Sequence, residues 1–181
     1  MTVNESGTAQ LRANRVAWQA GYDVWYMQER GTDTSMSIPR TPNIEHVREN
    51  PRSYLGTNHP PDLRDIAGLL VTDALCLGVH SIAVDIFEDW FVVSADADWI
   101  LKDSDRSVVE AFSRPQIFHQ HHKNSMRATV AVTAFTKEAI TVGGEGVTII
   151  NGEEATLAQA AATLCDRYPG RRVVAFRGIE T

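Results

Sequence analysis

The side chains best suited to chemistry in this 181-residue chain lie in one polar stretch, residues 114–127, with the sequence RPQIFHQHHKNSMR. Its chargeable residues are Arg114, His119, His121, His122, Lys123 and Arg127. Because imidazole changes charge near neutral pH and also ligates metals, such a cluster can provide a general acid or base, a metal site or an anion-binding lid. His119 and His121 would chelate a metal only in an extended segment, and no second group of ligands is identifiable. The alternative is a solvated polar loop.

The composition argues against two classes of partner. The net charge is −6, and Arg171-Arg172 is the only pair of adjacent basic residues, so binding to nucleic acid or to an anionic membrane surface is not expected. No apolar run approaches the roughly 18 residues needed to span a bilayer, and the N-terminus lacks an apolar signal segment. We therefore expect a cytoplasmic protein. Cys76 and Cys165 lie in apolar helical patterns and are expected to be buried, reduced thiols.

The elements that must position these residues follow from the hydrophobic pattern. Residues 60–78 predict a long helix, opened by two prolines and closed by Gly78, with apolar residues along one face. The hydrophobic pattern of residues 80–87 alternates as in a strand, and the chain then turns at Glu88-Asp89 into the apolar segment WFVVS. This pattern predicts an antiparallel hairpin. The pattern also predicts helices within 41–50, 103–112, 125–138 and 155–168, a second hairpin over 139–150, and a last strand at 171–177.

This order of helices and hairpins predicts an α+β fold, a two-layer sandwich in which a mixed, mostly antiparallel sheet carries helices on one face. Residues 1–40 are expected to form an N-terminal helical extension and loop, and residues 41–181 the domain itself. In the helix predicted at 125–138, Val130, Ala134 and Phe135 should point inward, and the threonines and the lysine outward.

The segment IEHVRENPRSYLG, residues 44–56, has a mechanical interpretation: Pro51 ends a helix, Tyr54 and Leu55 point into the core, and Gly56 permits a tight turn. It also resembles the Val-Arg-x-x-Pro-x-x-Tyr-Ile-Gly segment of the N-terminal ATPase domain of the DNA gyrase B subunit. The matching residues are Val47, Arg48, Pro51, Tyr54, Leu55 and Gly56. Because the order of elements downstream is similar too, residues 40–178 resemble the wider GHKL ATPase class and its fold.

The resemblance implies that the family's catalytic residues are missing. Where the family has a water-activating Glu and, one helical turn later, a Mg²⁺-binding Asn, this chain has Leu69 and Asp73. Leu69 cannot abstract a proton, so hydrolysis of ATP by the family mechanism is not expected. Asp73 keeps a carboxylate that can hold a ligand or a cation, and the alternative is a solvated or hydrogen-bonded surface group.

Two further motifs of the family are altered. The turn that binds adenine in the family, Asp-x-Gly-x-Gly, corresponds here to Ala95, Asp96, Ala97, Asp98 and Trp99. The glycines of the phosphate-binding loop correspond to Met126 and Ala128, whose side chains should block the close backbone approach that a triphosphate needs. Trp90 and Trp99 would either form a stacking wall for a ligand or belong to the core.

Two hypotheses follow from the resemblance. In the first, the former nucleotide pocket binds a different small molecule without a metal or cofactor. This hypothesis includes an acid/base reaction of the isomerase, cyclase or lyase type. Its catalytic residues would be His119, His121, Asp73 and Asp96. Its ligand-binding residues would be Leu69, Asp98, Trp99, Arg114, His122, Lys123, Met126 and Arg127. In the second, the chain is a non-enzymatic regulatory, decoy or immunity protein that acts through a protein partner or as a homodimer.

Overall fold

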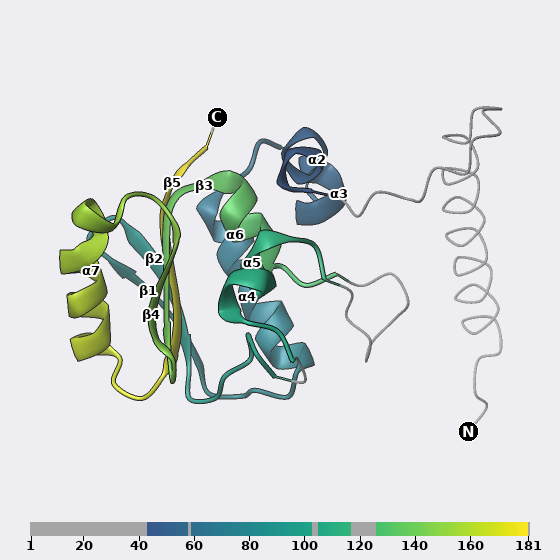
Figure 1. Ribbon diagram of the computed structural model, residues 1–181. Coiled ribbons are helices and arrows are strands. Elements are labelled where there is room, and N and C mark those ends of the chain that lie inside the picture. The colour runs from purple at the N-terminus through teal and green to yellow at the C-terminus, as the bar shows by residue number, and fades with distance from the viewer. Residues whose placement is uncertain (1–42, 58, 103–104, 117–125, 181) are drawn as a thin grey trace, which may run out of the picture. The chain divides into compact units, whose positions relative to one another are not determined.

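The computed structural model describes residues 43–57, 59–102, 105–116 and 126–180 (Figure 1). The expected N-terminal extension, residues 1–40, lies outside these ranges. The described chain forms six helices and five strands. The helices are α2 (Ile44–Glu49), α3 (Pro51–Leu55), α4 (Leu63–Cys76), α5 (Val108–Ser113), α6 (Thr129–Phe135) and α7 (Glu154–Arg167). The strands are β1 (Ile82–Phe87), β2 (Trp90–Ala95), β3 (Thr136–Gly143), β4 (Gly146–Asn151) and β5 (Arg172–Ile179).

The strands form one sheet in the order β1-β2-β5-β3-β4, and every pairing is antiparallel. Two hairpins, β1–β2 and β3–β4, therefore lie on either side of β5. The first hairpin turns at Glu88, whose φ of 54° is in the left-handed region. The predicted α+β class and the two predicted hairpins are confirmed, whereas the described strands include no parallel pair, so the sheet is not mixed.

Helices cover both faces of the sheet, which corrects the prediction that they lie on one face. Figure 1 shows α4, α5 and α6 on one side of the sheet and α7 on the other. The side chains of β2 contribute to the cores on both faces of the sheet. Val93 belongs to the core beneath α4 and α6, whereas Trp90 and Val92 belong to the core beneath α7. A strand buried on both faces has a continuous apolar run instead of an alternating one.

The two helices that flank the first hairpin begin and end at local sequence signals. The carboxylate of Asp62 accepts a hydrogen bond from the Arg64 amide at 2.7 Å and starts α4, and the chain reverses after α4 at Gly78, where φ is 74°. Ser107 and Glu110 form a capping box at the start of α5. Among the helices of the described residues, none has the length and apolar character to cross a lipid bilayer.

The helix predicted at 125–138 is shorter and more completely buried than expected. It is reduced to α6, and Thr136 already belongs to β3. The three residues expected to point inward are buried, but Thr129 and Thr136 are buried as well. Their hydroxyls donate to the carbonyl oxygens of Ala111 and Val132, so both polar groups are satisfied inside the protein. The expectation that these threonines face solvent is wrong.

Segment 44–56 has the local structure that its sequence predicts. Pro51 occupies the start of α3, Leu55 is buried, and Tyr54 packs against the core from a partly buried position. Gly56 ends α3 with a φ of 70°, which residues with a Cβ rarely adopt. Arg48 donates a hydrogen bond of 2.8 Å to a carbonyl oxygen of α6. These contacts attach α2 and α3 to the rest of the fold.

Candidate functional site

Three of the predicted site residues, Asp73, Trp99 and Arg127, meet inside the protein where α4 approaches the start of α6. Oδ2 of Asp73 accepts a hydrogen bond from the Ala128 amide at 2.7 Å and lies 3.8 Å from Nε of Arg127. Arg127 donates through Nη2 to the carbonyl oxygen of Trp99. The side chains of Asp73 and Arg127 are 8% and 7% exposed. Asp73 is therefore a buried, hydrogen-bonded group and not a solvated one.

The surroundings of Asp73 disfavour its charged form. Burial raises the pKa of Asp73 from 3.8 to about 6, although the hydrogen bond from the Ala128 amide and the positive charge of Arg127 both act to lower it. Burial prevails because the guanidinium nitrogen, at 3.8 Å, is beyond hydrogen-bond distance of the carboxylate.

Trp99 and Leu69 belong to the core at this place. Trp99 is fully buried, and its indole N–H has no hydrogen-bond partner among the described residues. Leu69, which is partly buried, packs against the same cluster of apolar side chains. Trp90 is buried against the opposite face of the sheet. Both tryptophans therefore have the core-packing role, and the indole of Trp99 fills space that a glycine would leave open.

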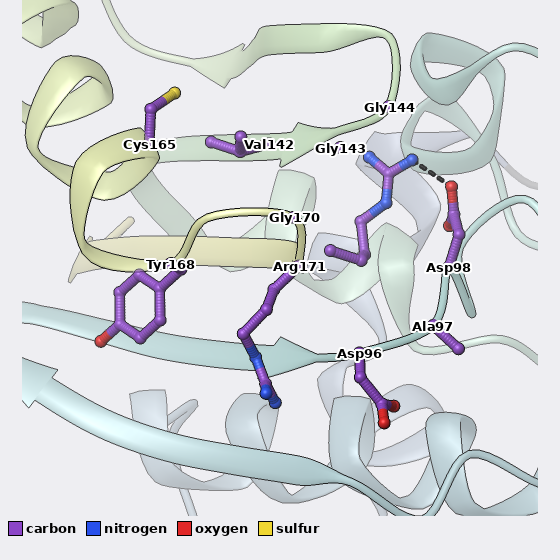
Figure 2. Close-up of a pocket in the computed structure, with 11 residues that line it drawn as sticks. Asp96, Ala97, Asp98, Val142, Gly143, Gly144, Cys165, Tyr168, Gly170 and Arg171 are labelled. Carbon is purple, nitrogen blue, oxygen red and sulfur yellow. Dashed lines mark hydrogen bonds and ion pairs between the residues drawn. The ribbon is translucent and has the colours of Figure 1, made fainter.

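A pocket of about 280 Å³ lies at one end of the sheet, where the ends of three connections converge (Figure 2). The chain after β2, the β3–β4 turn and the connection from α7 to β5 each contribute part of its wall. The lining residues are Asp96, Ala97, Asp98, Val142, Gly143, Gly144, Cys165, Tyr168, Gly170, Arg171 and Arg172. Asp96 and Asp98 are the predicted site residues that lie here. Figure 2 shows Asp98 at one side of the pocket and Cys165 and Tyr168 at the other.

A buried guanidinium with two carboxylate partners forms one wall of this pocket. Arg172, whose side chain is 1% exposed, pairs with Asp98 through Nη2 and with Glu145 through both terminal nitrogens. Asp98 also accepts hydrogen bonds from the amides of Ile100 and Leu101 at 3.0 and 3.1 Å. The cluster therefore joins the loop after β2, the β3–β4 turn and the start of β5.

Pairing with Arg172 lowers the pKa values of both carboxyls. Partial burial by itself would raise the pKa of Asp98, but the hydrogen bond from Arg172 and the two backbone amides together hold it below its usual value. The hydrogen bond from Arg172 is the largest influence on Glu145 and holds its pKa below the usual value as well. Both carboxylates are therefore ionised at neutral pH and already have a partner.

The second arginine of the pair ties the pocket to the first hairpin. Arg171 donates through Nη2 to the carbonyl oxygens of Ser81 and Ser94 at 3.0 and 3.3 Å. Asp96, by contrast, is exposed. The sequence signals for these residues are the Arg171-Arg172 pair and the two glycines of the β3–β4 turn, neither of which indicates a site by itself. Glu145, Cys165 and Tyr168 carry no such signal.

The remaining predicted site residues lie elsewhere. Arg114 is exposed just after α5, and Met126 is 39% exposed before α6. His119, His121, His122 and Lys123 lie outside the described residues. Within the described part of the chain, no group of three or more His, Cys, Asp or Glu residues is placed to hold a metal ion. Cys165 is partly buried, whereas Cys76 is exposed, so the expectation that Cys76 is buried is wrong.

Alanine at Gly143 should disrupt the Arg172 cluster, because a Cβ there would overlap the guanidinium. Since that group is buried and ion-paired on both sides, moving it is costly, and we expect a loss of about 2 kcal/mol in the free energy of unfolding. Gly144→Ala is the matched control, because its Cβ would meet open space. It should change the free energy by less than about 0.5 kcal/mol in urea denaturation. Equal effects of the two substitutions would show that Arg172 moves aside freely.

Compared with protein-family models, with curated proteins and with solved structures, the chain matches none of them. Its function is therefore inferred from the two places where its polar side chains gather, the buried Asp73–Arg127 pair and the pocket beside Arg172.

Proposed function

We propose that the chain is a cytoplasmic, gyrase B-like domain of GHKL type that does not hydrolyse ATP and binds a different small molecule. The proposal that the chain does not hydrolyse ATP is supported by the hydrogen bond from the Ala128 amide to Asp73. In a phosphate-binding loop, backbone amides at this kind of position receive the anion. Here a carboxylate of the protein itself accepts that hydrogen bond, and Trp99 and Ala128 belong to the same core cluster.

The ligand would bind in the pocket at the end of the sheet. The two terminal nitrogens of Arg172 are engaged by Asp98 and Glu145, and Nη2 of Arg171 donates to two carbonyl oxygens. The Nε atoms of both arginines have no partner among the described residues, but they are buried and therefore out of reach of a ligand. Asp96 is exposed and Asp98 is partly exposed, so both carboxylates can accept hydrogen bonds from a ligand. Such a pocket offers acceptors in preference to donors, and it therefore suits a small molecule rich in donors, an amine or a polyhydroxylated compound. An acid/base reaction in this pocket would use Asp96 as the proton-transferring carboxylate.

Thermal denaturation with added ligands tests this function. ATP and ADP with Mg²⁺ should leave the melting temperature unchanged, whereas one or more compounds from a set of amines, amino sugars and polyols should raise it by mass action. Asp96→Asn should abolish that rise. Glu153→Ala is the control, because Glu153 lies at the other end of α7 and makes no side-chain capping bond there.

Two results would contradict the proposal. A rise with ATP and Mg²⁺ that Asp73→Asn removes would show that the nucleotide site is intact. A rise with an amine or polyol that Asp96→Asn leaves unchanged would place the ligand elsewhere on the protein.

A second function is favoured by the bonds that two of the predicted carboxylates already make. Asp73 and Asp98 are both bonded inside the protein, and neither can accept a proton from a substrate without breaking those bonds. This favours a non-enzymatic regulatory, decoy or immunity protein that acts through protein contacts. Recovery of a stoichiometric partner protein with the full chain, unaffected by Asp96→Asn, would support this second function over the first.

A further inference from the structure

The outer edge of β1 is unpaired among the described residues. Sheet edges in natural proteins are commonly blunted by lysine, proline or a bulge, yet Ile82–Phe87 reads IAVDIF and pairs with β2 without a register shift. Its single charge, Asp85, accepts a hydrogen bond of 2.9 Å from the Tyr168 hydroxyl of the α7 side. Within the part of the chain that the structure describes, the edge is therefore open to a further strand.

The hydrogen-bonding phase of this edge can be assigned. The amide of Asp96 donates to the Ser81 carbonyl oxygen at 3.4 Å, and the two-residue turn Glu88-Asp89 makes Phe87 and Trp90 a hydrogen-bonded pair. Hydrogen bonding alternates along an antiparallel strand, so the odd-numbered residues of β1 bond to β2. The N–H and C=O groups of Ile82, Val84 and Ile86 therefore point away from the sheet.

The same three residues share one side-chain face, and two of them are exposed. Val84 is 51% and Ile86 is 65% exposed, on the face that carries α4. Two exposed β-branched residues on this unpaired edge suit a strand whose own side chains are apolar at the same spacing.

We infer that β1 pairs with β1 of a second copy of this chain, antiparallel and centred on Val84. In this register Ile82 lies opposite Ile86 of the second copy, and Val84 lies opposite its own counterpart. About six backbone hydrogen bonds would form, since all three facing pairs are of the hydrogen-bonded kind. The two sheets then become one continuous sheet about a twofold axis.

Charge selects this register over its neighbours. Centring on Val84 places Asp85 opposite Ala83 and His80 opposite Glu88, where His80 and Glu88 are both exposed. Centring on Asp85 instead would set two identical carboxylates directly opposite one another, which is destabilising. Centring on Ala83 would shorten the pairing and place Ile86 opposite His80. The segment HSIAVDIFE is thus complementary to itself in one register.

Sedimentation velocity of the full chain over a concentration series tests the inference. The unmodified chain should form dimers, and Val84→Lys should raise the dimer dissociation constant by about 100-fold or more, because two ammonium groups would meet at the twofold axis. The matched control is Val147→Lys on the opposite edge strand, β4, where Val147 is 43% exposed. It should leave the constant unchanged. Both sites are exposed, and far-ultraviolet circular dichroism verifies that each variant is folded.

A cysteine at position 84 tests the register. In the Cys76→Ser, Cys165→Ser background, Val84→Cys should oxidise to a covalent dimer, since directly opposite Cα atoms about 5.5 Å apart lie within disulfide range. Val147→Cys should not. A monomer at all concentrations, a dimer that Val84→Lys leaves intact, or an absence of the Val84→Cys cross-link would each overturn the inference. So would a monomeric Val84→Cys variant whose new thiol resists thiol reagents, because another segment would then cover the edge.

Discussion

Replacing Arg172 with alanine should lower the free energy of unfolding by about 3 kcal/mol. The guanidinium is almost wholly buried and is the shared partner of Asp98 and Glu145, so its removal leaves two negative charges side by side and a cavity beneath them. The loss should be smaller than the largest losses of stability that follow the removal of one partner of a buried ion pair. The reason is that Asp98 and Glu145 are 38% and 33% exposed and can regain water. Urea denaturation at pH 7 measures it.

The matched control for Arg172 is Arg177, which also pairs with two carboxylates, Glu138 and Asp89. Its side chain is 30% exposed, so Arg177→Ala should cost about 1 kcal/mol or less. The difference between the unmodified chain and Arg172→Ala should also shrink as the pH falls below about 4, where the carboxyls that Arg172 holds at lowered pKa become protonated. A pH-independent difference, or equal losses at the two arginines, would contradict the proposed role of the cluster.

Asp73 should make the protein less stable as the pH rises. Its pKa is about 6 in the folded state against 3.8 ordinarily, so the folded chain holds this proton more tightly than the unfolded chain. The contribution of Asp73 is therefore fully present below about pH 4 and is lost by about pH 6. The change corresponds to roughly 3 kcal/mol. Other carboxyls act in the opposite direction, so the effect is measured as a difference between the unmodified chain and Asp73→Asn.

Asparagine is the appropriate replacement, because its side-chain oxygen can still accept the hydrogen bond from the Ala128 amide while carrying no charge. Denaturation at intervals between pH 4 and pH 7 should show the unmodified chain losing stability relative to Asp73→Asn as the pH rises. A difference that stays constant, or that grows in favour of the unmodified chain at pH 7, would mean that the attraction of Arg127 outweighs the cost of burying the charge.

Most elements of this fold can be predicted from the sequence because each has a local signal. Asp62 and Ser107 cap helices, Gly78 ends one, and Glu88-Asp89 turns the first hairpin. The placement of α7 has no such signal, since its buried stripe of Leu157, Ala161 and Leu164 would fit either face of a sheet. The cue lies in the strand it covers: WFVVS is apolar on both sides, as a strand packed on both faces must be.

The candidate site is predictable only in part. The order of elements brings Asp73, Trp99 and Arg127 together, but whether they border a cavity or the core depends on how an indole packs, which spacing does not encode. Arg172 and Glu145 are separated by 27 positions. A charged residue at the start of a strand ordinarily indicates an exposed group. Nothing local shows that Arg172 is buried with two partners brought to it by the strand order.

The strand that comes last in chain order, β5, lies in the middle of the sheet. Each hairpin can form from neighbouring residues, but neither touches the other until β5 fits between them. During synthesis on a ribosome, the two hairpins therefore cannot join into one sheet until residues 172–179 have emerged. The apolar flanks of β2 and β3 stay accessible to chaperones for that interval. A premature stop before Arg172 would remove the central strand and leave two unjoined hairpins.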